Sequence, residues 1–196
     1  MRILRFLTAA ALLVLSAQQA QATHAYGGEI TWKCLPNGQF KFYVRYYRDC
    51  GQGFDSPGQT IQLATNHPIG SITLSQTNYV SSAVTGTDVS PTCYLTPAPI
   101  SCGGVSAGQG GIQEKRYESL PITLTGIPPA VGWVFSLTVN ARPTVLSNIP
   151  GSSDLVLRAI MYPYTLNGIQ QNTNTCYDSS PRFLEPPKSV ICTGYE

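Results

Sequence analysis

The chain has 196 residues, with 12 basic and 10 acidic side chains, 18 glycines and 15 prolines. Two of the basic residues and none of the acidic ones fall in the first 22 positions, so the rest of the chain carries ten of each and has a formal charge of zero. A nucleic-acid-binding protein is expected to show a basic excess or a basic stripe, and neither is present. The length suits one domain with a hydrophobic core.

The amino terminus has the three parts of an export signal in the correct order. Arg2 and Arg5 supply positive charge, Phe6 to Leu15 is an apolar run, and Ala20-Gln21-Ala22 matches the A-x-A cleavage rule. As a helix, ten apolar residues would rise only about 15 Å, roughly half of a bilayer core, which argues against a membrane anchor. We therefore predict a signal peptide over residues 1–22, removed to leave Thr23 first, and one domain over residues 23–196.

Six cysteines follow the predicted cleavage site, and an even number in an exported chain indicates disulfides. They are Cys34, Cys50, Cys93, Cys102, Cys176 and Cys192. A metal site is disfavoured, because there is no C-x-x-C motif and no cysteine beside a histidine.

The disulfide connectivity can be predicted only in part. Cys93 and Cys102 close a short loop, so we expect them to pair. Cys34 and Cys50 would lie at opposite ends of one hairpin and should not pair with each other. That exclusion favours Cys50 with Cys176 and Cys34 with Cys192, but the sequence leaves the connectivity of these four open.

Short runs of alternating residues predict β-strands. Phe40, Phe42, Val44 and Tyr46 recur at period two, so that in an extended chain they share one face. The turn sequence Leu35-Pro36-Asn37-Gly38 precedes them, and Asn-Gly is a strong hairpin signal. We expect a hairpin between two strands, Gly28–Cys34 and Gln39–Arg48.

The remaining strands are predicted from similar runs between Gly, Pro, Asn and Ser residues. They are Gln59–Thr65, Ser71–Ser75, Gln113–Thr125, Trp133–Asn140, Asp154–Tyr162 and Lys188–Cys192. No segment after the signal has a helical period over three turns. About eight or nine strands predict an all-β, immunoglobulin-like antiparallel β-sandwich with disulfides. Trp133, Phe135 and Leu137 should lie in its core, facing Phe40, Phe42 and Val44 or their neighbours.

One segment has the form of a hydrolase nucleophile elbow without its context. Gly104-Val105-Ser106-Ala107-Gly108 matches G-x-S-x-G, but glycines replace the strand and helix that an elbow needs. Both histidines also come before this serine, against the hydrolase order. We therefore expect no catalytic residues and a protein that is not an enzyme.

Two metal hypotheses rest on few residues. If cleavage fell after Thr23, His24 would be the first residue and could bind copper together with His67. With that arrangement the chain would resemble lytic polysaccharide monooxygenases. Asp49 and Asp55 flank a glycine-containing loop and could contribute to calcium binding, although two carboxylates do not define a site. The expectation is therefore no metal and no cofactor, with calcium near Asp49 and Asp55 left open.

The chain resembles a known bacterial domain family in several segments. The opening is His24-Ala25-Tyr26-Gly27-Gly28-Glu29-Ile30-Thr31-Trp32 with Cys34, and Tyr46-Tyr47-Arg48-Asp49-Cys50 follows it. The likeness continues through 111–114, 133–136 and 150–153 to 179–183, 186–187 and 191–192. The pattern is similar to the amino-terminal domain of large, gliding-motility-associated surface proteins of Bacteroidota.

That resemblance implies an extracellular, adhesin-like β-domain. Such domains often head chains with PKD or immunoglobulin-like repeats and a sorting domain for type IX secretion. This sequence stops at Glu196 without either feature, which leaves a fragment or a stand-alone copy as alternatives. The family supplies no catalytic residues to carry over.

The expected function is therefore a non-enzymatic, secreted or cell-surface adhesion module. Its expected partner is an extracellular protein or glycan, together with further domains if the chain is a fragment. It should bind no nucleic acid, and no membrane span is expected after the signal. One alternative is a carbohydrate-binding module that uses exposed aromatics such as Tyr43 or Tyr47. Another is a secreted, copper-dependent enzyme acting on polysaccharide.

Overall fold

The structure is a computed structural model, and part of the chain is described. The described residues are 25–50, 57–81, 85–90, 100–102, 111–139, 154–171, 176 and 178–184. Within these ranges every regular element is a β-strand, and no helix is long and apolar enough to cross a membrane. The predicted signal peptide and the predicted strand Lys188–Cys192 lie outside them.

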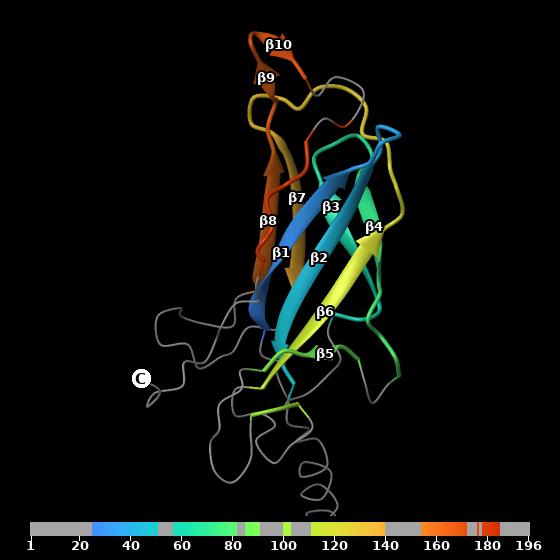
Figure 1. The fold of residues 1–196 in the computed structure, drawn as a ribbon, viewed down its shortest axis with the longest axis vertical. Helices are drawn as coiled ribbons and strands as arrows, with labels where there is room; N and C mark the ends of the chain where they lie inside the picture. The colour runs from blue at the N-terminus through green and yellow to red at the C-terminus, as the bar shows by residue number, and fades with distance from the viewer. Residues whose placement is uncertain are drawn as a thin grey trace, which may run out of the picture.

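Eight strands form one antiparallel sheet, and two short strands form a separate hairpin (Figure 1). The order in the large sheet is β1-β2-β6-β4-β3-β7-β8, with β5 also pairing with β6. The strands are β1 (Ala25–Cys34), β2 (Phe40–Asp49), β3 (Thr60–Thr65), β4 (Ser71–Gln76), β5 (Thr87–Asp88), β6 (Ile112–Ser119), β7 (Trp133–Val139), β8 (Leu155–Met161), β9 (Thr165–Leu166) and β10 (Ile169–Gln170).

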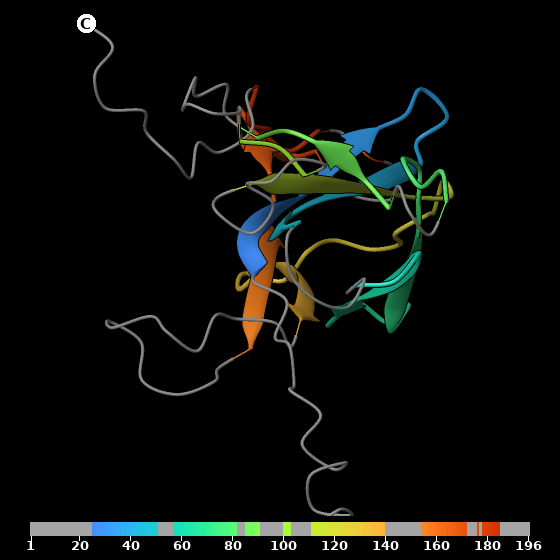
Figure 2. The same ribbon diagram turned by 90° about the horizontal axis from the view of Figure 1, so that it is seen from below.

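The predicted β-sandwich is confirmed, and its two layers are halves of one folded sheet. Seen from below, β1, β2 and β6 form one layer, and β3, β4, β7 and β8 face them from the other (Figure 2). The β6–β4 pair joins the two layers. The two ends of the sheet meet where Gly28 of β1 packs against Leu157 of β8. The sheet therefore curls almost into a barrel around its core.

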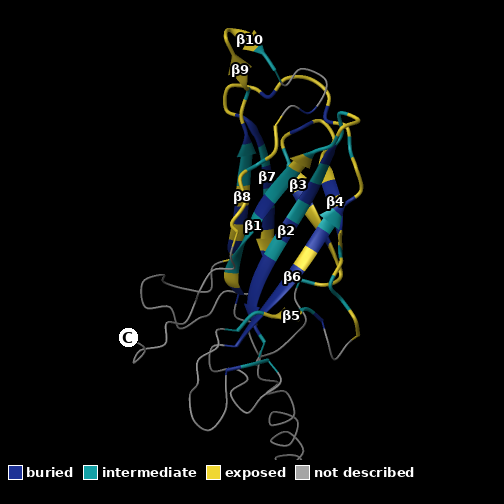
Figure 3. Cartoon of the chain, in the orientation of Figure 1, coloured by how far each residue is buried: buried dark blue, intermediate teal, exposed yellow. Residues whose placement is uncertain are grey.

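The core contains the aromatic stripes that alternation predicted. Phe42 and Phe135 are both 0 % exposed, and their ring centroids lie 4.6 Å apart. Trp133 and Leu137 are buried on the same face of β7, and Phe40 and Val44 are buried on β2. Figure 3 shows buried positions along the strands and exposed ones in the projecting β9–β10 hairpin. The prediction that these two strands face each other is confirmed.

Two Asn-Gly sequences form turns of different types between paired strands. Between β1 and β2 the amide of Gly38 donates to the carbonyl of Leu35, and Gly38 has φ 78°. Between β9 and β10, Asn167 and Gly168 have φ values of 49° and 77°, the pattern of a two-residue type I′ hairpin. The first turn was predicted, and the second hairpin was missed although it carries the same signal.

The sixth strand is shorter than predicted. It was expected over Gln113–Thr125, but β6 ends at Ser119. Pro121 follows closely and has no amide hydrogen for a further sheet bond. The chain then touches the sheet once more, through an isolated bridge between Ile122 and Phe40. The two-residue strand β5 was not predicted.

The described residues contain two disulfides, Cys34–Cys176 and Cys50–Cys102. The predicted pairs Cys93–Cys102, Cys34–Cys192 and Cys50–Cys176 are therefore wrong. Cys93 and Cys192 lie outside the described residues. That Cys34 and Cys50 do not pair with each other is confirmed.

Contacts between distant segments decide these pairings. Cys50 directly follows β2, and its amide donates to the carbonyl of Gly111, the residue before β6, which brings it to the segment that contains Cys102. Cys176 donates its amide to Gly38 in the β1–β2 turn, beside Cys34. Closeness in sequence, on which the Cys93–Cys102 prediction rested, was the weaker guide.

Candidate functional site

The outer face of β1, β2 and β6 carries polar side chains in regular rows. The register of the three strands places Glu29, Arg45 and Arg116 in one row, Thr31, Tyr43 and Glu118 in the next, and Lys33 beside Lys41 in a third. These residues point away from the core, because they alternate with its buried residues. The alternation of β2 thus makes an apolar interior and a charged exterior from one strand.

An ion network crosses this face. Arg45 lies 3.6 Å from a carboxylate oxygen of Glu29 and 3.6 Å from one of Glu114. Arg116 holds the other oxygen of Glu114 at 2.7 Å. The hydrogen bond to Glu114 raises the pKa of Arg116, outweighing the opposite effect of its partial burial. Two acids and two arginines therefore balance one another.

A C-terminal segment, residues 178–184, lies along the free edge of β1, and we call it the strap. Trp32 donates its amide to the hydroxyl of Ser180 at 2.8 Å and accepts the amide of Ser180 at 3.0 Å. The amide of Cys34 donates to the hydroxyl of Ser179 at 3.0 Å. Further along, the amide of Phe183 donates to Glu29 at 3.2 Å. The strap thereby covers a sheet edge that would otherwise expose unpaired backbone groups.

A groove of about 410 Å³ lies between the strap and the outer face of β1 and β2. That volume falls in the usual range for small-ligand sites. Its lining consists of Glu29, Thr31, Trp32, Lys33, Tyr43, Arg45, Ser179, Ser180 and Arg182. Lys33 and Arg182 are exposed, and Tyr43 is half-buried.

Lys41 lies outside the lining of this groove but contacts Tyr43, which lines it, and is held in place. Its ammonium group forms an ion pair with Glu118 and lies 5.5 Å from the centroid of the Tyr43 ring. The hydrogen bond to Glu118 is the main cause that raises the pKa of Lys41. The charge of Lys41 is therefore matched by Glu118, and its side chain rests against Tyr43.

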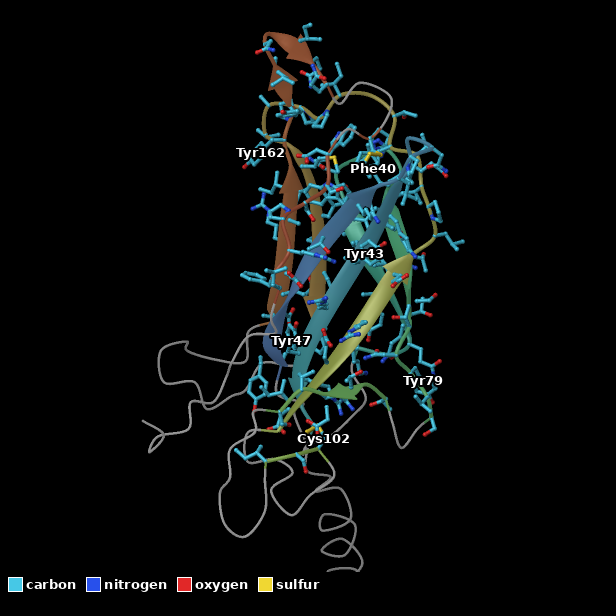
Figure 4. All side chains as sticks on the ribbon, viewed as in Figure 1. Phe40, Tyr43, Tyr47, Tyr79, Cys102 and Tyr162 are labelled. Carbon is cyan, nitrogen blue, oxygen red and sulfur yellow. A yellow bond between two sulfur atoms is a disulfide. The ribbon has the colours of Figure 1, made fainter. Side chains whose placement is uncertain are left out.

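The two tyrosines proposed for carbohydrate contact, Tyr43 and Tyr47, lie in different environments (Figure 4). Tyr43 lines the groove, as a binding aromatic should. Tyr47 is 2 % exposed, and its hydroxyl donates to Glu114 at 3.5 Å. Burial, and after it the charge of Glu114, raises the pKa of Tyr47. Tyr47 therefore does not form an exposed aromatic surface, and that part of the hypothesis is wrong.

A second hollow, of about 230 Å³, lies on the other side of the strap. It is lined in part by Tyr162, Tyr164 and Pro163, just beyond β8, and by Asp178. Tyr162 and Tyr164 are exposed. This hollow is smaller than the groove, and none of the described residues that line it is basic.

His67 has a structural role in the turn between β3 and β4. Its Nδ1 accepts the amide of Ile69 at 3.1 Å, so the ring proton is on Nε2, which donates to the carbonyl of Thr125 at 3.1 Å. Its ring also packs edge-on against Trp133, with centroids 4.6 Å apart. Both nitrogens are engaged, which removes His67 from the copper hypothesis. His24 lies outside the described residues.

The described residues supply no second ligand for calcium beside Asp49. Asp49 is buried at the end of β2. Burial, together with the charge of Asp49 and a hydrogen bond to it, raises the pKa of Tyr26, so Asp49 interacts with this phenol. Asp55 and the segment 104–108 lie outside the described part of the chain. Within that part, no three His, Cys, Asp or Glu side chains form a group suited to a metal ion.

The chain was compared with protein-family models, curated proteins and solved structures, and nothing matches it.

The groove was not predicted from the sequence. Its strap comes from a segment about 145 positions away from β1, as the Cys34–Ser179 contact shows. The alternation of Thr31, Lys33, Tyr43 and Arg45 with core residues was the only available signal, and it indicated an outer face without indicating what covers it.

Proposed function

We propose that this protein is a non-enzymatic, extracellular adhesion module that binds its partner through the groove beside the strap. The observation that carries the proposal is the groove itself, a ligand-sized hollow built on a paired β-sheet and closed on one side by a hydrogen-bonded strap. The resemblance to adhesin-like Bacteroidota surface domains points in the same direction.

Two features support export. The amino terminus carries the charged, apolar and A-x-A parts of a signal peptide. The described chain contains two disulfides, which persist in oxidising compartments and are rare in the cytosol. Both features fit a protein that is secreted to the cell surface.

The chemistry of the groove supports binding over catalysis. Among the described residues, Glu29 is the one carboxylate in its lining, and its charge is satisfied by Arg45 and by the amide of Phe183. A carboxylate whose oxygens are engaged by a guanidinium and a backbone amide is held in place, which suits structure and recognition.

Carbohydrate binding is a second candidate, favoured by Tyr43. Its ring lines the groove near the hydroxyl of Thr31 and the cations of Lys33 and Arg182. An aromatic ring with a few polar groups around it is a common arrangement in ligand pockets. The two candidates are compatible, because an adhesion module can recognise a surface glycan.

The proposal can be tested with beads carrying the oxidised protein without residues 1–22. We expect these beads to be retained on at least one of four coatings, mucin, collagen, polygalacturonate or galactan, above their retention on albumin. Soluble sugar released from the same coatings is measured in parallel, and none is expected. Intact-mass analysis of exported protein should show Thr23 as the first residue.

Two results would contradict the proposal. Release of soluble sugar, with or without added copper, would mean that the protein is an enzyme. Retention no higher than on albumin for every coating would remove the support for adhesion. A mature terminus at His24 would reopen copper binding at the amino terminus.

A further inference from the structure

We propose that the groove between the strap and the β1–β2 face binds an acidic saccharide, with Lys33 and Arg182 contacting its carboxylates and Tyr43 packing against a sugar ring. This inference rests on the proposed function and names the ligand class of the same groove.

The charge balance of the groove points to an anionic ligand. Among the charged groups in its lining, Glu29 and Arg45 belong to the balanced network with Glu114 and Arg116. Lys33 and Arg182 are left, and neither has an ion-pair partner among the described residues. The described lining of the groove therefore presents two positive charges without a counterion among the described residues, although the chain after residue 22 has a formal charge of zero.

The sheet register adds a second observation. Lys33 and Lys41 are direct cross-strand partners on β1 and β2. Like charges placed directly opposite each other destabilise a sheet. Glu118 compensates Lys41 and leaves the charge of Lys33 at the groove without a counterion on the described chain. A bound carboxylate would offset this repulsion, which gives the site a physical reason to prefer an anion.

The middle of the groove suits a sugar ring. Tyr43 is half-buried between Thr31 on β1 and Glu118 on β6, and Lys41 lies against its ring. The C–H face of a sugar packs on an aromatic ring as any apolar surface does, by dispersion and removal from water. A free phosphate or sulfate would use the cations and leave the ring without a partner. An acidic saccharide uses both.

The strap is fixed before any ligand arrives. The disulfide Cys34–Cys176 ties the chain to β1 just before the strap, Ser180 is bonded to Trp32 through its amide and its hydroxyl, and Phe183 is bonded to Glu29. Arg182 lies between these last two attachments, so its backbone position is set. A preorganised wall lowers the ordering cost of binding.

The test is a calorimetric titration of the oxidised, mature protein with tetragalacturonate as the acidic probe. The neutral analogue galactotetraose and a tetraglutamate peptide serve as comparison ligands. We expect binding of the acidic sugar, weakening as salt rises because the two cations are exposed. The two comparison ligands should bind at least about tenfold more weakly.

Matched variants locate the site. Lys33→Gln and Arg182→Gln should each weaken tetragalacturonate binding about fivefold, and Arg158→Gln, an exposed cation on β8, should leave it within about twofold. Tyr43→Ala should weaken binding about tenfold, whereas Tyr43→Phe, which keeps the ring, should retain it. Melting temperatures identify any variant that fails to fold. If Tyr43→Ala or a cation variant does not fold, the affinities of Tyr43→Phe and Arg158→Gln still test the predicted binding.

Each contrary outcome has a defined meaning. Equal binding of galactotetraose would overturn the anion assignment, and equal binding of tetraglutamate would overturn the saccharide assignment. Unchanged affinity in both Lys33→Gln and Arg182→Gln would overturn the site. If beads adhere to a coating while tetragalacturonate fails to bind, this inference falls and the adhesion proposal stands. If neither is observed, both fall.

Discussion

The ring of Phe42 on β2 meets the ring of Phe135 on β7 across the interior, with centroids 4.6 Å apart and planes tilted by 51°. Both side chains are fully buried, and they join the two layers of the sandwich. Phe135→Ala should cost about 3–5 kcal/mol, because truncation of a buried aromatic leaves a cavity. Thr138→Ala, on the exposed face of the same strand, should cost little. Melting curves that coincide for Phe135→Ala and the parent would show that this contact does not hold the layers together.

Gly28 lies at a close contact between the two ends of the sheet. A Cβ at this position would collide with the carbonyl of Arg45 and lie 2.7 Å from Cδ1 of Leu157. Gly28→Ala should therefore lower stability by about 1–3 kcal/mol, as overpacking does. Gly58→Ala is the matched control, because a Cβ there meets nothing within 4 Å. Equal urea midpoints for the two variants would rule out the close approach of β8 to β1.

The disulfide Cys34–Cys176 should stabilise both the fold and the strap. It links the end of β1 to a residue 142 positions later, just before the strap begins. The double variant Cys34→Ala/Cys176→Ala should lose about 2–5 kcal/mol of unfolding free energy. Peptide mapping without reduction should recover Cys34 with Cys176 and Cys50 with Cys102. A peptide joining Cys34 to Cys192, or Cys93 to Cys102, would contradict the structure.

Tyr46 should make the fold sensitive to alkali. Burial raises its pKa to about 12, and the nearby charge of Arg48 acts in the opposite direction. Unfolded tyrosine has the ordinary value of 10.0, so the folded state keeps the proton longer. Stability from this group is therefore complete below about pH 10 and is lost as the pH rises through about 12.

The variant Tyr46→Phe removes that titration. The Tyr46 hydroxyl has no hydrogen-bond partner among the described residues, so the change should cost little at neutral pH and should shift the alkaline unfolding midpoint upward. Tyr117→Phe is the contrasting variant. The hydroxyl of Tyr117 donates to the carbonyls of Pro57 and Gly58, so its loss should cost about 1 kcal/mol. If Tyr46→Phe were the more damaging change, the hydroxyl would have a partner.

Local pattern was enough to predict most strands and the core. The side chains of Phe40, Phe42 and Val44, and of Trp133 and Phe135, face inward as alternation predicted, because a pleated strand fixes the direction of every second side chain. The Asn-Gly signal predicted the β1–β2 hairpin, and the same signal at Asn167-Gly168 would have found β9 and β10.

The pairing of strands that are distant in the chain could not be predicted from local sequence patterns. Nothing local states that β6 lies between β2 and β4, and it is this placement that brings Cys50 to Cys102. Alternation also predicts which face of the sheet a side chain points to, but not whether other residues cover that face. Tyr47 faces outward, yet its contact with Glu114 leaves it buried, which a single sequence could not show.

The candidate site was predictable only in outline. Tyr43 was identified as a possible binding aromatic, and it does line the groove. The cations Lys33 and Arg182 come from segments far apart in the chain and meet only because the strap bonds to β1 through Ser179 and Ser180. The charge of the groove is therefore a property of the fold, invisible in a composition whose net charge is zero after residue 22.

Hydrogen–deuterium exchange with and without tetragalacturonate tests the central claim of groove recognition most directly, because it locates a binding site without any substitution. The amides of residues 29–33, 43–45 and 179–183 should become more protected in the presence of the sugar, and galactotetraose should leave them unchanged. Protection confined to residues 162–171, at the hollow beyond β8 and the β9–β10 hairpin, would place recognition elsewhere. Unchanged exchange across the whole chain would contradict recognition of this sugar at the groove.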